Sequence, residues 1–153
     1  MNFTLQEILA LLQSKNRCLE RLMVATRDFL STTVDALVTE GASGKGPLTD
    51  YEKSRTTIIE TLQMHDRKIG ELIESLTPAD RTPEFLSAAR EEVTRNERLI
   101  VSIFNADDIV FRKIGEAQSQ ITKLIQENRK SHERLSRFKS GPGSTGEEMD
   151  MTL

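Results

Sequence analysis

Apolar residues recur at alternating steps of three and four along the stretch that follows Pro83, which contains no further proline before Phe138. These steps reach sixteen positions between Leu86 and Phe138, and twelve of them are apolar. A mean step of 3.5 residues keeps one stripe on one side of a helix, so the pattern predicts a single helix over 83–138 with a coiled-coil seam. At 1.5 Å per residue this helix would be about 80 Å long.

A second apolar stripe predicts an earlier helix over about 4–40. Thr4 and Glu7 have the spacing of a capping box at its start. Gly41 offers a left-handed cap at its end. The three glycines of 41–47 then predict a flexible linker.

A third stripe predicts a helix over about 48–76, which again opens with a capping-box spacing at Thr49. Two Thr-Pro pairs follow, at 77–78 and 82–83, and each combines a threonine cap with proline at the first helical position. They predict a short turn before the long helix. The glycine- and serine-rich start and acidic end of 140–153 predict a disordered tail.

These elements predict an all-α fold in a single helical domain over 1–139. Its form is an elongated antiparallel three-helix bundle, or coiled-coil hairpin, with a very long C-terminal helix. A short turn makes the last two helices antiparallel, so the helix over 48–76 can cover the long helix only to about Arg112. The remainder, 113–138, would project by about 40 Å.

The projecting segment has an apolar stripe of its own. Burying one Ile, Leu or Phe is worth roughly 1.5–3 kcal/mol, so several such side chains in water predict a cover. Candidate covers are a second copy of the chain, a helix of a client protein, or the first helix if its linker lets it shift along the rod. The predicted partner-binding residues are Ile114, Ala117, Ile121, Leu124, Ile125, Leu135 and Phe138.

Composition narrows the class of protein. The chain has 153 residues, of which 37% are hydrophobic, and a net charge of −3, so it can form a core and has no overall attraction to nucleic acid or anionic membranes. Cys18 is the only cysteine, which excludes an intramolecular disulfide and fits a reducing compartment. The first residues lack the basic start of a signal peptide, and no apolar run of about 18 residues predicts membrane insertion. We therefore expect a cytoplasmic protein.

Candidate catalytic and metal-ligating residues are few. Asp107 and Asp108 are adjacent carboxylates, but no histidine or further carboxylate at helical spacing completes a site. An unpaired buried carboxylate is costly, so we expect Asp107, which lies on the seam, either to meet an Arg or Lys of a facing helix or to lie where the seam is open to water. His65 and His132 are each followed by an acidic residue, and adjacent side chains of a helix point apart. The sequence thus predicts no enzyme, no metal and no cofactor.

Neither group of basic residues indicates a phosphate or nucleic-acid ligand. Gly44-Lys45 is not a phosphate loop, because Thr39 and Gly46 stand where that motif needs Gly and Ser or Thr. Cations at the end of the long helix complement its carbonyl end and keep it soluble. Nucleic-acid binding would require aromatic residues among them, and only Phe138 is near. These cations are Arg129, Lys130, Arg134, Arg137 and Lys139.

Two stretches resemble the flagellar export chaperones of the FlgN/FliT type. The sequence LTDYEKSRTTIIETL, over 48–62, is similar to the Glu- and Lys-rich segment that opens the second helix of that family. The sequence NERLIVSIFNADDIVFRKI, over 96–114, resembles the last long helix of the family, in which Asn or Asp interrupts an apolar stripe. The long first helix with its flexible link and the Gly/Ser-rich tail are also similar.

The resemblance implies a cytoplasmic type III flagellar export chaperone. Such a protein would bind C-terminal helices of late export substrates, the hook-filament junction or cap proteins, prevent their premature assembly and deliver them to the export apparatus. The client site would then lie on the stripe from Ile114 to Phe138. The strongly basic end of the long helix departs from the family pattern. The alternatives are a structural coiled-coil homodimer or adaptor without chaperone activity, and an enzyme that uses the two aspartates with a metal.

Overall fold

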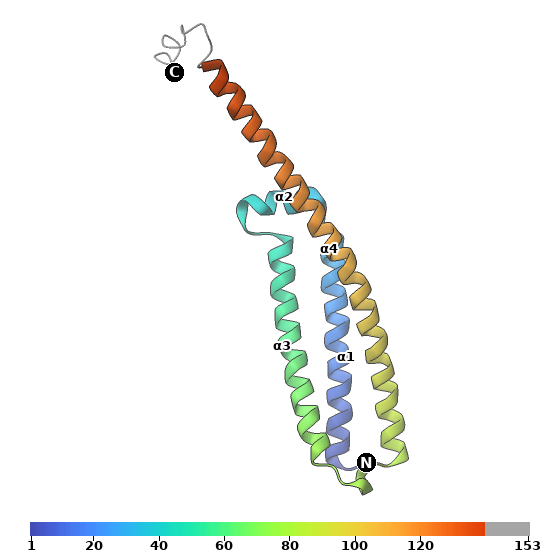
Figure 1. Cartoon of the computed structure of the whole chain (residues 1–153). Helices are drawn as coiled ribbons and strands as arrows, with labels where there is room; N and C mark the ends of the chain where they lie inside the picture. Colours follow the sequence, from blue (N-terminus) through green and yellow to red (C-terminus); the bar gives the residue numbers. More distant parts are fainter. Residues whose placement is uncertain (140–153) are drawn as a thin grey trace.

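The computed structural model describes residues 1–139, and nearly all of them are helical (Figure 1). The elements are α1 (Phe3–Leu30), α2 (Val34–Ser43), α3 (Pro47–Glu74), the short 3₁₀ helix η1 (Pro78–Asp80) and α4 (Pro83–Lys139). No strand occurs among the described residues. The prediction of an all-α fold with a very long C-terminal helix is confirmed, and α4 alone has 57 residues. The predicted tail over 140–153 lies outside the described residues.

Helix α1 lies between α3 and α4 and packs along both of them (Figure 1). The helices α3 and α4 each pack mainly against α1 rather than against each other. Three clusters of buried apolar side chains follow one another along these helices. The first contains Leu5, Ile8 and Phe85, the second Leu19, Leu22 and Ile103, and the third Phe29, Leu37, Tyr51, Val110 and Ala117. The core therefore extends along the molecule and ends beneath α2.

The buried side of α4 follows the predicted seam only in part. Ile103 and Val110 of the seam are buried, but Leu86 and Val93 are 38% and 45% exposed. Phe85 is buried in place of Leu86. One residue turns a helix by about 100°, so the start of α4 is rotated relative to the predicted stripe.

The predicted helix over 4–40 is wrong in its last part, because α1 ends at Leu30. The Thr32 hydroxyl donates a hydrogen bond to the carbonyl of Phe29 at 2.6 Å. The Thr33 hydroxyl accepts a backbone N–H from the first turn of α2, which makes Thr33 the N-cap of that helix. Hydroxyl groups that bond to the nearby backbone compete with the helical ladder, so these threonines end α1 and start α2 in a new direction.

The start of α1 also differs from its prediction. Asn2 rather than Thr4 is the N-cap, and its Oδ1 accepts the backbone N–H of Leu5 at 2.9 Å. The Asn2 amide nitrogen donates to Asp80 Oδ1 at 3.0 Å. This contact ties the beginning of α1 to the turn between α3 and α4.

The predicted flexible linker over 41–47 is largely replaced by structured residues. Helix α2 continues past Gly41, and Gly44, with a φ of 72°, is the left-handed cap that was expected at Gly41. Only residues 44–46 separate α2 from α3, which begins at Pro47. The two helices are thus joined by a tight turn.

The turn between α3 and α4 agrees with its prediction. Thr77 forms a capping box with Asp80, and the Thr82 hydroxyl accepts the backbone N–H of Phe85 at 3.2 Å. The prolines of both Thr-Pro pairs occupy the first positions of η1 and α4. Helix α4 therefore starts near the end of α3, runs back past it and continues beyond α2 (Figure 1).

Candidate partner-binding surface

The seam of α4 changes its neighbours along its length. Up to about Val110 it packs against α1, and from there to Ile121 it packs against α2. Beyond α2, α4 extends alone to Lys139 in the described part of the chain (Figure 1). A projecting segment is therefore present, but it is shorter than expected.

Helix α2 covers the first three of the seven predicted partner-binding residues. Ala117 is 5% exposed and belongs to the same buried cluster as Leu37 of α2, and Ile114 packs against that cluster. Ile121 is half-buried, and its Cδ1 lies 2.8 Å from the position that a Cβ would take on Gly41. The expectation that the whole stripe beyond Arg112 lacks a cover in a simple three-helix bundle is therefore wrong for this part. The cover is α2, most of which belongs to the predicted first helix over 4–40, and the turn after α1 places it across the stripe.

The other four predicted residues are exposed. Leu124 and Ile125 are 48% and 47% exposed, and Leu135 and Phe138 are 60% and 69% exposed. All four lie on residues 122–139, which we call the projecting end of α4. Leu124, Leu135 and Phe138 continue the 3.5-residue seam that α1 and α2 cover elsewhere. We call these four side chains the exposed seam.

A cleft marks the boundary between the covered and the exposed seam. Its volume is about 550 Å³, and it is lined by Asp35, Val38 and Thr39 of α2 and by Gln120, Lys123, Leu124 and Glu127 of α4. A second cavity, of about 230 Å³, lies where α2, α3 and α4 meet. Leu124 thus lines the cleft and also begins the exposed seam, so a helix on this seam would abut the edge of α2.

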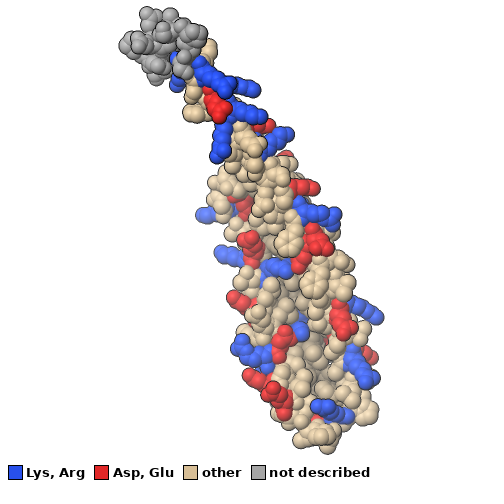
Figure 2. Space-filling model, in the orientation of Figure 1, with Lys and Arg blue, Asp and Glu red and all other residues tan. Residues whose placement is uncertain are grey.

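Polar and charged side chains surround the exposed seam. Asn128 and Ser131 occupy the seam positions between its two apolar pairs, and both are exposed. The projecting end contains six Lys or Arg residues and two Glu. Figure 2 shows these basic side chains crowded at this end of the molecule, whereas acidic and basic side chains alternate along the remainder of the visible face. The projecting end is therefore a basic rod with a narrow apolar face.

Comparison of the chain with known proteins identifies no relative. No known protein family, curated protein or solved structure matches it. Among residues 1–139, no helix is both long enough and apolar enough to cross a membrane. The same residues contain no group of three or more His, Cys, Asp or Glu placed to hold a metal ion. The geometry of α4 is thus the main basis for assigning a function.

Of the two surroundings expected for Asp107, the first is confirmed, because its carboxylate meets a cation of a facing helix. Arg55 of α3 donates two parallel hydrogen bonds to its carboxylate, from Nη1 to Oδ1 at 2.9 Å and from Nη2 to Oδ2 at 3.0 Å. Desolvation lowers the pKa of Arg55, but its hydrogen bonds to Asp107 and Tyr51 outweigh this effect, so the pKa lies above the usual value. The ion pair of Asp107 with Arg55 thus joins α4 to α3. This structural role is sufficient to explain why a carboxylate lies on the seam.

An exposed apolar patch on the middle of α4 was not predicted. Val101, Phe104 and Phe111 are 58%, 65% and 71% exposed. Phe104 and Phe111 are seven residues apart and share one face of the helix, which is a signal that the sequence contains. It was missed because Ile103 and Val110, each one residue earlier, belong to the longer 3.5-residue stripe, which predicts the buried side of the helix.

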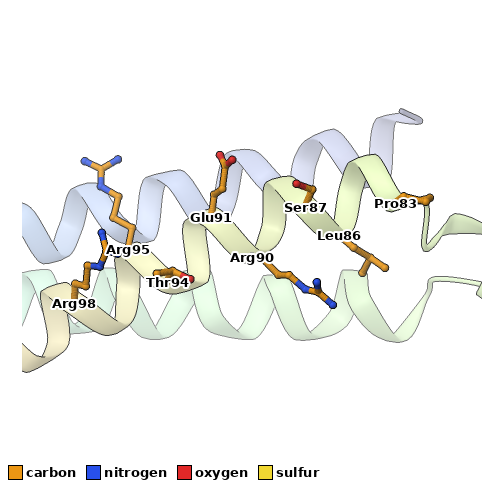
Figure 3. A pocket seen from close by; sticks show the side chains of 8 residues that line it. All are labelled: Pro83, Leu86, Ser87, Arg90, Glu91, Thr94, Arg95 and Arg98. Atoms are coloured by element: carbon orange, nitrogen blue, oxygen red, sulfur yellow. The ribbon is translucent and has the colours of Figure 1, made fainter.

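A shallow hollow with a volume of about 910 Å³ lies near the start of α4 (Figure 3). All its lining residues belong to α4, between Pro83 and Arg98. Leu86 and Arg90 point toward α3, and Glu91 and Arg95 point to the opposite side (Figure 3). Arg95 forms an ion pair with Glu20 of α1. A hollow formed by one helix, with its charges exposed, has no enclosed polar group to fix a small ligand.

Proposed function

We propose that this chain is a cytoplasmic type III flagellar export chaperone. It would bind a C-terminal helix of a late export substrate, a hook-filament junction or cap protein, and prevent its premature assembly. The observation that carries the proposal is the exposed seam, which continues a face of α4 that α1 and α2 cover elsewhere. The resemblance of 48–62 and 96–114 to FlgN/FliT-type chaperones supports the choice of client.

A helix is the partner that best fits the exposed seam. A stripe with a period of 3.5 residues is covered most completely by another helix, whose side chains fit between those of the first. Burying one Leu, Ile or Phe from this seam is worth roughly 1.5–3 kcal/mol. A client helix would continue the packing that α2 makes up to Ile121. The rest of the chain, arranged as an elongated antiparallel three-helix bundle, would support α4.

A structural homodimer is the second candidate, because the exposed seam is equally available to another copy of the chain. Pairing two projecting ends would, however, bring together two sets of six cations, and like charges across an interface are destabilising. Light scattering separates the two candidates. A dimer that persists on dilution to nanomolar concentration favours the structural protein, whereas a monomer favours the chaperone.

Substitution of the exposed seam tests the chaperone proposal. The variant Leu124→Asp/Leu135→Asp places two carboxylates on the seam without disturbing a buried side chain, because both leucines are exposed. We expect the wild-type chain to retain flagellar subunits from a lysate of its own cell, as identified by mass spectrometry, and the variant to lose them. Circular dichroism should show the same helical content for both proteins.

The matched control is Phe104→Asp/Phe111→Asp, which changes two exposed side chains of the patch on the middle of α4. We expect this control to retain the flagellar subunits. Capture that is lost only in the control would place the client on the middle patch and contradict the proposed site. Failure of the wild-type chain to retain any flagellar subunit would contradict the proposed function.

A further inference from the structure

Positive charge is concentrated at the projecting end of α4. The whole chain has a net charge of −3, but residues 122–139 contain six Lys or Arg and only two Glu. These six cations are exposed, and none forms an ion pair with a carboxylate among residues 1–139. Their charge is therefore available to a partner (Figure 2).

The carbonyl end of the helix accounts for only part of this charge. The helix dipole acts within the last turn, where Arg137 and Lys139 lie. Arg129, Lys130 and Arg134 precede that turn. The dipole does not explain these three cations.

Two of the cations occupy coiled-coil positions that flank the seam. Arg134 and Lys139 lie immediately outside the seam pair formed by Leu135 and Phe138, one before it and one after it. In a coiled coil, residues next to the seam meet the flanking residues of the facing helix and determine which partner is accepted. Carboxylates at those positions of a partner would form ion pairs, and ammonium groups would be repelled.

The middle of the exposed seam favours a helix over a bilayer surface. Residues 126–134 contain no apolar side chain, which separates the two apolar pairs by about 15 Å. A bilayer that accepted both pairs would also bury Asn128 and Ser131, at a cost, because lipid chains offer no hydrogen bonds. Polar side chains of a facing helix can bond to them. A second copy of this chain would bring the same cations to the interface.

We propose that the projecting end of α4 selects an acidic amphipathic helix. The apolar residues of the partner helix would face Leu124 and Ile125 at one end and Leu135 and Phe138 at the other. The carboxylates of the partner helix would face Arg134 and Lys139. This inference rests on the proposed function, since it specifies the chemistry of the client helix.

Two synthetic peptides of about 20 residues test the inference. Both carry the same apolar stripe with polar residues at its centre, and they differ only in having Glu or Lys at the flanking positions. Fluorescence anisotropy with the full chain should show binding about tenfold tighter for the Glu peptide, because two attractive pairs replace two repulsive ones. The preference should weaken as salt is raised. It should reverse in Arg134→Glu/Lys139→Glu and persist in the control Arg90→Glu/Arg98→Glu, at the start of α4.

Several outcomes would overturn the inference. Equal affinity for the two peptides, or a preference that the Arg134→Glu/Lys139→Glu variant retains, would remove the charge selection. Binding to phosphatidylserine vesicles with no binding to either peptide would assign the rod to a membrane surface. Glu-peptide binding that appears only after removal of residues 140–153 would assign the surface to the chain's own acidic terminus.

The inference and the proposed function can fail separately. A strong preference for the Glu peptide, combined with no capture of flagellar subunits by the wild-type chain, would leave the acidic-helix selection intact and reject the flagellar client. Capture of flagellar subunits that survives both high salt and Arg134→Glu/Lys139→Glu would leave the chaperone function intact and reject the selection by charge.

Discussion

At the level of single residues, Glu40 joins two helices through its side chain. It lies on α2, but its carboxylate caps α3, accepting the backbone N–H groups of Leu48 at 2.7 Å and Thr49 at 2.8 Å. The Thr49 hydroxyl donates to the same carboxylate at 2.9 Å. A Cβ on Gly46 would lie 2.9 Å from Glu40 Cδ, so the glycine leaves room for this cap. Glu40 thus fixes α2 to the start of α3.

Removing the charge of Glu40 should lower stability in a pH-dependent way. Desolvation raises the pKa of Glu40, but hydrogen bonds from Thr49 and Leu48 outweigh this effect, so the folded-state pKa lies below its usual value. A lowered pKa contributes stability above the unfolded-state pKa, about 4.3, and this contribution is lost as the pH falls through the folded-state value. We expect Glu40→Gln to lower the free energy of unfolding by about 0.5–2 kcal/mol at pH 7, and by less below about pH 4.

Urea unfolding at both pH values measures this difference. The matched control is Glu60→Gln, an exposed glutamate on α3, which should leave the free energy of unfolding nearly unchanged. A deficit in Glu40→Gln that is equally large at both pH values would show that the side chain acts through its shape rather than its charge.

At the level of elements, α2 determines how much of the α4 seam is available. It has only ten residues, and an isolated helix of that length is unstable in water. Its position therefore depends on tertiary contacts, chiefly on Leu37, which is 5% exposed and packs in the cluster with Val110 and Ala117. A partner helix on the exposed seam could not extend past Leu124 toward Ile121 without displacing α2.

Truncation of Leu37 should loosen α2 before the rest of the chain. Leu37→Ala removes buried methyl groups from the last core cluster, a change that typically costs about 2–5 kcal/mol. We expect amide hydrogen exchange to become faster over 34–43, while the amides of α1 near Leu5 and Ile8 keep their rates. The exposed Val24 offers a matched control, and Val24→Ala should leave exchange in α2 unchanged. An equal increase throughout the helices would show that α2 does not open separately.

In the whole molecule, the packed part and the projecting end are physically distinct. The three core clusters reach from the turn between α3 and α4 to the crossing of α2, and the projecting end lies beyond them. Its large apolar side chains are 47% or more exposed. Its own burial therefore contributes little to the stability of the fold, and its apolar surface remains available for binding.

Removal of the projecting end should leave the fold intact. We expect a chain that ends at Ile121 to lose less than about 1 kcal/mol of unfolding free energy, because none of the side chains from 122 to 139 is buried. The comparison is a chain that ends at Val110 and therefore lacks Ile114 and Ala117, which pack beneath α2. Its loss of unfolding free energy should be several times larger. Urea unfolding followed by circular dichroism measures both. A large loss for the longer truncated chain would show that the projecting end supports the packed helices.

The length of α4, its seam and the need of Asp107 for a cation follow from the amino-acid sequence, because helical periodicity, proline spacing and the cost of an unpaired carboxylate are local properties. The Thr-Pro turn before α4 is equally local. The tertiary structure alone decided that Glu40 of α2 caps α3, that α2 crosses the seam between Val110 and Ile121, and that Phe85 rather than Leu86 is buried. Each of these depends on where another helix lies in space. The exposed seam from Leu124 to Phe138 results from both, since the sequence determines the apolar stripe and the place where α2 crosses α4 determines how much of it is exposed.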